Sequence, residues 1–149
     1  MCTLSNFASN IGAGVVSAAL VLLIQHVSVQ WRNWTRFGPM AGDYEEEFTP
    51  NHAPTGGTIR IMVHGTTLNV EAINKTNTVE WRAKVHMSTL NPDVGEGTYL
   101  YEKDKTDSGV LRIQRLPATQ DFIVRGSNTS DPRGVDKFNT LWRARKTST

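Results

Sequence analysis

The sequence predicts an all-β protein: a small antiparallel up-and-down β-barrel of about eight strands, preceded by one N-terminal transmembrane α-helix. Two observations lead to this fold class. From Phe7 to Val29 the chain is apolar or small, with isolated polar residues and no charged one. After Ala41, apolar residues recur at every second position, and turn residues interrupt them every eight to twelve positions or so. The first pattern is typical of a membrane-spanning helix, and the second of antiparallel strands.

The apolar run is long enough to cross a bilayer. At about 1.5 Å per residue, about 23 helical residues extend about 35 Å, against a hydrocarbon core about 30 Å thick. A secretory signal peptide would require a basic region before the apolar run, and Met1–Asn10 has none. A buried core helix would fit the strictly apolar part Ile11–Ile24, but the aromatic and basic residues that follow favour a membrane boundary. The sequence therefore predicts a transmembrane helix over residues 1–30.

The next segment, residues 31–40, is expected to be an aromatic and basic linker at the membrane surface. Trp31, Trp34 and Phe37 alternate with Arg32 and Arg36, and these residue types lie at the level of lipid headgroups. No Lys or Arg precedes Arg32, so the positive-inside rule predicts that the N-terminus lies outside and the C-terminal domain in the cytoplasm. We therefore expect a single-pass protein of the inner, cytoplasmic membrane, with the lipid bilayer as a partner.

The helix also carries small residues at helical spacing. Ala8 precedes Gly12, and Gly14 precedes Ala18, by one turn each. Pairs of small residues at this spacing let two helix backbones approach closely in lipid. We therefore expect the chain to form a homo-oligomer through Gly12, Gly14 and Ala18.

Residues 41–146 are expected to form the barrel, followed by a short tail over residues 147–149. The alternation is clearest from Val79 to Met87, where apolar residues alternate with Glu80, Arg82, Lys84 and His86. One face of that strand is therefore buried and the other solvated. The same pattern predicts further strands over Asp43–Phe48, Thr58–His64, Thr67–Ile73, Thr98–Glu102, Val110–Arg115, Asp121–Arg125 and Lys137–Arg143.

Turn residues separate the predicted strands. Pro54–Gly57 and Asn91–Gly97 are two of the segments whose composition favours reversal of the chain. Short connections favour antiparallel neighbours, and closure of about eight strands into a barrel removes both exposed edges. A two-sheet sandwich would show the same alternation, and the barrel is the preferred prediction.

Charge and composition argue against several functional classes. Only Arg32 and Arg36 of the 16 basic residues precede Met40, whereas all 14 acidic residues follow it, so the barrel is formally neutral. A neutral domain lacks the basic surface that polymeric nucleic acid requires. The single cysteine, Cys2, and four scattered histidines supply no metal-ligand set, and no nucleophile or phosphate-loop motif is present. We expect a protein that is not an enzyme and uses no metal or cofactor.

Aromatic and arginine residues recur on neighbouring predicted strands. Such residues are most often ordinary core aromatics and surface arginines, because a small barrel fills its own interior. The alternative is a ligand pocket in which rings stack on a flat base and arginines hold phosphate oxygens, as a nucleotide second messenger would require. The candidate ligand-binding residues are Tyr44, Arg60, Trp81, Tyr99, Tyr101, Arg112 and Arg125.

The acidic run Glu45-Glu46-Glu47 falls on the first predicted strand. Alternation sends Glu45 and Glu47 to one face and Glu46 to the other. A solvated strand explains this run better than a metal site does.

The order of an N-terminal anchor, an aromatic and basic junction and a small barrel beginning Gly42-Asp43-Tyr44 resembles the membrane-anchored minimal β-barrel effectors of bacterial cyclic-oligonucleotide antiphage defence. The resemblance is one of architecture and covers most of the chain, although those effectors typically carry two membrane helices. It implies a barrel that senses a cyclic nucleotide made during infection, a chain that oligomerises, and clustered helices that disrupt the inner membrane. Two other functions stay open: a membrane-tethered interaction or structural barrel, and a lipocalin-like carrier of a small apolar ligand.

Overall fold

The computed structural model describes the backbone of residues 4–48, 53–128 and 137–145, and the side chains of residues 15–48, 56–127 and 139–145. The chain divides into two compact units, Met1–Thr35 and Arg36–Thr149. The first contains nearly all of the helix α1 (Leu4–Phe37), and the second contains the strands.

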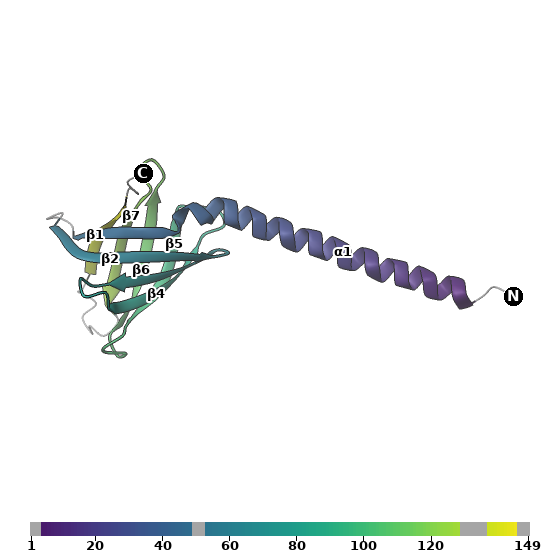
Figure 1. The fold of residues 1–149 in the computed structure, drawn as a ribbon, viewed down its shortest axis with the longest axis horizontal. Coiled ribbons are helices and arrows are strands. Elements are labelled where there is room, and N and C mark those ends of the chain that lie inside the picture. Colours follow the sequence, from purple (N-terminus) through teal and green to yellow (C-terminus); the bar gives the residue numbers. More distant parts are fainter. Residues whose placement is uncertain (1–3, 49–52, 129–136, 146–149) are drawn as a thin grey trace. The chain divides into compact units, whose positions relative to one another are not determined.

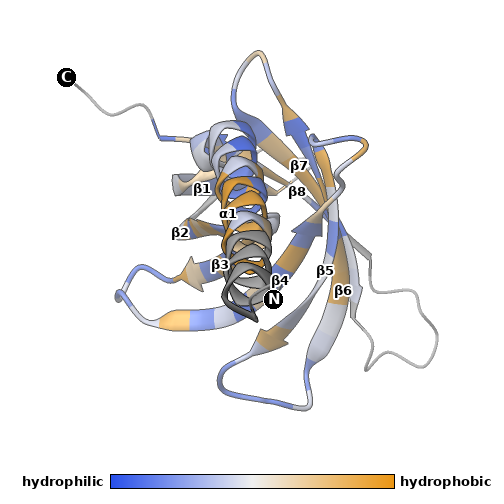
Figure 2. Cartoon of the chain, turned by 90° about the vertical axis from the view of Figure 1, so that its right-hand side faces the viewer, coloured by the Kyte–Doolittle hydropathy of each residue, from blue (hydrophilic) through white to orange (hydrophobic). Residues whose placement is uncertain are grey.

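The helix α1 is continuous (Figures 1 and 2), and the apolar side chains of its residues 15–34 are exposed. Leu22 is 65% exposed and Ile24 is 60% exposed. The segment Val15–Met40 is long and apolar enough to cross a membrane, a property that it shares with signal sequences. The helix was expected to end near residue 30, with a linker after it. Instead α1 continues through residues 31–37.

The second unit is a closed barrel in which each strand pairs with its neighbours in sequence (Figure 1). All of its strand pairs are antiparallel, and β1 closes the barrel by pairing with β8, Tyr44 opposite Ala144. The predicted up-and-down barrel is therefore confirmed, and the sandwich is excluded. A short 3-10 helix, η1 (Gly38–Met40), leads into β1 (Gly42–Phe48), β2 (Ala53–His64), β3 (Thr67–Ile73), β4 (Val79–Met87), β5 (Val94–Tyr101), β6 (Ser108–Leu116), β7 (Asp121–Asn128) and β8 (Lys137–Ala144).

The outer face of the barrel carries ion pairs between directly opposite residues of neighbouring strands. Arg60 contacts Asp43 at 3.0 Å across β1 and β2, and Arg82 contacts Glu71 at 2.9 Å across β3 and β4. Exposed pairs of this kind contribute little to stability because solvent screens them, but opposite charges on facing residues favour the correct register. The inner face is apolar, with Ile59, Ile61, Leu68, Val70, Val85, Leu111, Ile113, Phe122, Val124 and Trp142 in its core.

One end of the barrel is filled by the residues that lead into β1. Phe37 and Met40 are 1% and 0% exposed and belong to the core. Tyr44 donates a hydrogen bond from its hydroxyl to the Met40 carbonyl at 2.9 Å. Its ring packs edge-on against that of Phe122, with 5.4 Å between the ring centroids. This end of the barrel is therefore packed by one continuous stretch of chain.

This packing corrects two expectations. Phe37 was expected at the lipid headgroups, but its ring is enclosed by the barrel, because the chain leaves α1 at Gly38 and Pro39 and packs its next apolar residues inward. Tyr44 was expected in a ligand pocket, but it is 3% exposed and its hydroxyl is already bonded to Met40. Both residues support the fold at this end.

A third difference concerns β5, which begins at Val94 rather than at Thr98. Gly95 and Gly97 were assigned to a turn, but both lie in the strand. A Cβ atom at Gly97 would overlap the carbonyl oxygen of Lys84 on β4. Glycine is therefore required here because the two strand backbones approach closely.

Replacing Phe37 with Ala should destabilise the barrel by about 3 kcal/mol, because it removes a fully buried ring and leaves a cavity. Thermal unfolding of the full chain in detergent, followed by near-ultraviolet circular dichroism, measures this as a lower Tm. Trp34→Ala is the control, since Trp34 is 67% exposed, and its Tm should stay close to that of the wild type. Equal and small shifts for both variants would contradict the burial of Phe37.

Tyr44 should make stability depend on pH in the alkaline range. Burial, opposed by the charge of Arg115 and assisted by that of Asp121, raises the pKa of the Tyr44 phenol from its usual 10 to about 12. The folded state therefore holds this proton more tightly than the unfolded chain does, so its contribution is complete below pH 10 and is lost as the pH rises toward 12.

The free energy of unfolding of the wild type should fall more steeply over that interval than that of Tyr44→Phe, which lacks the ionisable group. Near neutral pH the variant should lose about 1 kcal/mol, the hydrogen bond to Met40. Denaturant titrations at several pH values measure both effects. Parallel alkaline losses in the two proteins would contradict the assignment.

Candidate ligand-binding site

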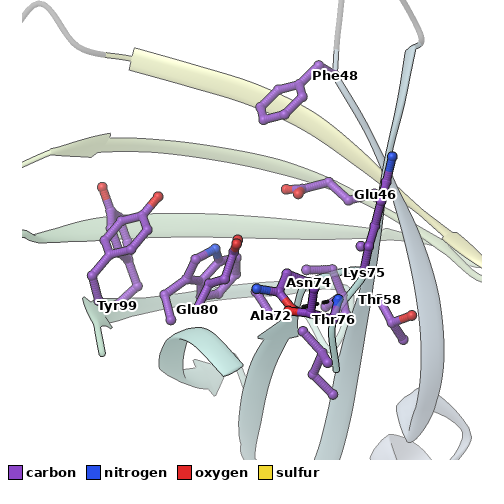
Figure 3. Close-up of a pocket in the computed structure, with 14 residues that line it drawn as sticks. Glu46, Phe48, Thr58, Ala72, Asn74, Lys75, Thr76, Glu80 and Tyr99 are labelled. Carbon is purple, nitrogen blue, oxygen red and sulfur yellow. Dashed lines mark hydrogen bonds between the residues drawn. The ribbon is translucent and has the colours of Figure 1, made fainter. Parts of the chain in front are cut away.

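A cavity of about 510 Å³ lies at the barrel end opposite η1, where β1 and β5 finish and β2 and β4 begin. We call it the mouth pocket. Figure 3 shows Glu46, Phe48 and Tyr99 around the same space. The mouth pocket is lined by Glu46, Phe48, Gly57, Thr58, Ile59, Ala72, Ile73, Asn74, Lys75, Thr76, Glu80, Trp81, Tyr99 and Tyr101.

Aromatic rings form one wall of the mouth pocket. The ring centroid of Tyr99 lies 6.0 Å from that of Trp81 and 5.9 Å from that of Tyr101. Trp81 continues the wall into the core, where its centroid lies 6.2 Å from that of Trp142. Because each ring packs against another ring, the wall is held in place by its own contacts.

Irregularities in the strand ladders adjoin this pocket. The β1–β2 register shifts between Glu45 and Glu47, beside Glu46, and the β3–β4 register shifts between Ala72 and Ile73, beside Glu80. Bulges at barrel rims re-aim side chains, and here each adjoins a carboxylate of the pocket. Pro54–Gly57, expected to be a turn, lies within β2 at the first of these bulges.

Glu46 is the member of the acidic run that faces the barrel interior. It lies opposite Trp142 in the β1–β8 ladder. Its neighbours face outward, where Glu47 contacts Arg143 at 2.8 Å and Glu45 contacts Arg145 at 3.2 Å. The alternation expected for these three residues is therefore the one observed.

The surroundings of Glu46 oppose its ionisation. Burial raises the pKa of its carboxyl, interactions with the side chains of Trp142 and Thr140 lower it, and the charge of Glu80 raises it again. The buried indole nitrogen of Trp142 makes no hydrogen bond of ordinary geometry within the part of the chain that the structure describes. It nevertheless lies close enough to the Glu46 carboxyl to lower the pKa of that group, so an indole N–H lies beside this carboxyl of the pocket.

The negative charges at the pocket also act on the phenol of Tyr101. Burial raises the pKa of its phenol, and the charges of Asp107, Glu46 and Glu80 raise it further. Its hydroxyl therefore keeps its proton at neutral pH and is available as a hydrogen-bond donor at the pocket wall.

The β3–β4 turn forms a rigid part of the rim. The Asn74 side-chain oxygen accepts hydrogen bonds from the backbone N–H groups of Thr76 and Thr78, each at 3.0 Å, and from the Thr76 hydroxyl at 2.7 Å. Lys75 crosses the glycine of the β2 bulge, where a Cβ at Gly56 would overlap the Lys75 Cε atom. Gly56, with φ of +74°, therefore allows the lysine stem to lie directly over the strand.

The structure brings together only some of the candidate ligand-binding residues. Trp81, Tyr99 and Tyr101 line the mouth pocket, whereas Tyr44 is in the core at the other end. The three arginines lie on the outer face and cannot hold a phosphate inside the pocket. Arg60 contacts Asp43 at 3.0 Å, Arg112 contacts Glu96 at 3.5 Å, and Arg125 is exposed opposite Arg112.

The residues expected at the membrane surface are split between the two units. Trp31 and Trp34 are exposed with ring centroids 5.9 Å apart, and Arg32 is exposed beside them. Arg36 donates a hydrogen bond to the Thr89 carbonyl at 2.9 Å, in the β4–β5 connection. Of the residues expected to mediate helix association, Ala18 is exposed on α1, and Gly12 and Gly14 lie where only the helix backbone is described.

Sequence reasoning missed the polar half of the pocket: Glu80, Lys75, Asn74 and Thr76. Glu46 gave a signal, because alternation placed it alone on the apolar face of its strand. Glu80 gave none, because alternation placed it with the outward residues of β4, and the bulge that re-aims it depends on pairing with β3. Within the described part of the chain, no group of His, Cys, Asp and Glu is arranged to hold a metal ion.

No model of a protein family matches the chain, and neither the curated proteins nor the solved structures contain a match to it.

Proposed function

We propose that the chain is a membrane-tethered, non-enzymatic receptor whose barrel binds a small flat ligand in the mouth pocket. The observation that carries the proposal is the pocket itself, with its stacked aromatic wall and its few convergent polar groups. Small-molecule sites have this composition and a volume of roughly 300–1,000 Å³. The exposed apolar helix α1 supplies the tether.

The distribution of filled and empty space favours a receptor over a purely structural barrel. Phe37 and Met40 pack one end completely, whereas the other end keeps a cavity of about 510 Å³. A barrel that only presents its outer surface to a protein has no use for such a cavity. The carboxyls of Glu46 and Glu80 also distinguish the pocket from that of a carrier for purely apolar molecules, because unpaired carboxyls oppose an apolar occupant.

A cyclic-nucleotide sensor that oligomerises and disrupts the membrane in antiphage defence is the narrowest form of this proposal. It draws on the architectural resemblance and on the rings of Trp81, Tyr99 and Tyr101, on which a base could stack. Its phosphates would meet Lys75, the one basic residue among the described pocket residues, but also the carboxyls of Glu46 and Glu80, so the pocket lining supports this form less than it supports a neutral or cationic ligand. Cyclic nucleotides belong in the ligand screen as its test, beside nucleosides and aromatic amines.

Replacing Ala72 with Phe should abolish ligand binding. Ala72 is 5% exposed and lines the mouth pocket, so the ring of the new Phe would occupy the cavity. Ligand-observed NMR with the full chain in lipid nanodiscs, against cyclic di- and trinucleotides, nucleosides and planar amines, measures binding. Ala72→Leu, a smaller change, should weaken binding and covers the case in which the larger ring prevents folding. Thr98→Phe adds the same ring on the outer face of β5 and should bind as the wild type does.

The receptor proposal fails if no compound in that screen binds, or if Ala72→Phe binds as well as Thr98→Phe. The same spectra report turnover. New product signals that require Glu46 or Glu80 would contradict the non-enzymatic part, since two neighbouring carboxyls are also the groups that acid–base hydrolysis uses.

The proposed topology places the N-terminus outside the inner membrane, the barrel in the cytoplasm, and pairs of α1 helices together in lipid. Cys2 is the only cysteine of the chain, so labelling and cross-linking at Cys2 can test both the orientation of the N-terminus and the association of the helices. A membrane-impermeant maleimide should label Cys2 from outside intact cells, and a bifunctional maleimide should cross-link two chains. Gly14→Leu should reduce cross-linking without changing labelling. Labelling only after lysis would contradict the orientation, and equal cross-linking of Gly14→Leu would contradict association through the small residues.

A further inference from the structure

We infer that the mouth pocket selects a cation: a flat apolar ring that carries a protonated amine, with the amine between Glu46 and Glu80 and the ring against Trp81. This inference rests on the proposed receptor function, because it names the ligand class of the same pocket.

The charges that line the pocket are mainly negative. Glu46 and Glu80 contribute two carboxyls, and Lys75 contributes the one cation among the described lining residues. The Lys75 stem lies across Gly56 on β2. Within the described part of the chain, neither carboxyl forms an ion pair of 4.0 Å or less, in contrast to Glu45 and Glu47, whose arginine partners lie on the outer face.

Glu46 is the more deeply placed of the two carboxyls, because it faces the barrel interior opposite Trp142. Its described surroundings are an indole N–H, a hydroxyl and the repelling charge of Glu80, and burial raises its pKa. A carboxylate removed from water without a cation carries a desolvation penalty. An ammonium ligand would offset that penalty, and it would also relieve the repulsion between Glu46 and Glu80.

The aromatic wall suits the same ligand. The face of an aromatic ring attracts a cation within about 6 Å, and the attraction strengthens where water is excluded. The wall of the pocket formed by Trp81, Tyr99 and Tyr101 lies near both carboxyls. The charges of Glu46 and Glu80 each raise the pKa of the Tyr101 phenol, which belongs to this wall. Rings and carboxyls therefore act on one space rather than on two separate sites.

The bulges make this arrangement a feature of the fold rather than of flexible side chains. One register shift adjoins Glu46 and the other adjoins Glu80, and both occur at the mouth. Without the β3–β4 shift, regular alternation would turn Glu80 to the outer face of β4, beside Arg82. The backbone itself therefore directs the second carboxyl to the pocket.

An anion has the opposite fit. A carboxylate or phosphate placed in the pocket would meet the charges of Glu46 and Glu80 at short range. The arginines that could compensate lie on the outer face of the barrel, where Arg60 and Arg112 already contact Asp43 and Glu96.

Three indoles with the same ring and different charge test the inference: tryptamine, tryptophol and indole-3-acetate. Calorimetric titration of the full chain in nanodiscs, with empty nanodiscs as the reference, measures their affinities. Tryptamine should bind about tenfold more tightly than tryptophol, and indole-3-acetate most weakly.

Isosteric variants identify the groups responsible. Glu46→Gln and Glu80→Gln should each weaken tryptamine binding about tenfold and leave tryptophol binding nearly unchanged, because only the cation gains from the charge. Glu80 is exposed, so its variant keeps the test informative if Glu46→Gln fails to fold. Glu96→Gln removes a carboxyl from the outer face, where it contacts Arg112, and should bind all three indoles as the wild type does.

Equal affinities for the three indoles, tightest binding of indole-3-acetate, or binding of none would each overturn the cation inference. The receptor proposal stands or falls separately, on the broader screen and the Ala72→Phe variant.

Discussion

The interior of a closed eight-stranded barrel is small, and this limit decides where side chains can pack and where a cavity can remain. A barrel of this size has room for its own side chains and at most one small ligand. Here the room is divided unequally. Phe37, Met40 and Tyr44 fill the end at which the chain enters, and the hydrogen bond from Tyr44 to Met40 ties η1 to the first strand. The opposite end keeps its cavity, and that difference is the basis for assigning a binding role.

The packed end also bears on the membrane part of the account. The apolar stretch of α1, a candidate membrane span, is followed directly by Phe37 and Met40, which are core residues of the barrel. In the proposed topology, the residues that face lipid therefore stop before Phe37, and Trp31, Arg32 and Trp34 are exposed residues that could lie at a membrane surface. At the open end, two bulges and a stacked aromatic wall place the carboxyls of Glu46 and Glu80 where a ligand would lie.

The alternation of apolar and polar residues was enough to predict where the strands lie, because the inward and outward faces of a strand impose a period of two on the sequence. Val79–Met87 and Thr67–Ile73 match their predicted bounds. The errors came where a residue's role depends on a partner strand. Gly97 looked like a turn residue, but it is glycine because Lys84 on β4 comes too close for a side chain.

Only some of the residues that line the pocket could be predicted from the sequence, for the same reason. Trp81, Tyr99 and Tyr101 reach the pocket because alternation alone directs them inward. Arginine was chosen by residue type, yet alternation and facing carboxylates hold Arg60 and Arg112 outside. Glu80 depends on a register shift that no single strand encodes. Phe37 was assigned by its neighbours in sequence, and its burial follows from the path of the chain after α1.

In the proposed function, a ligand enters the mouth pocket and contacts its aromatic wall. Fluorine NMR of the full chain with 5-fluorotryptophan at its four tryptophans tests this most directly. In nanodiscs, saturable addition of tryptamine should shift the resonance of Trp81, which lines the pocket, and that of Trp142, whose ring packs against Trp81, and leave those of Trp31 and Trp34 in place. Saturable shifts confined to Trp31 and Trp34, or no shift at any tryptophan, would contradict the account.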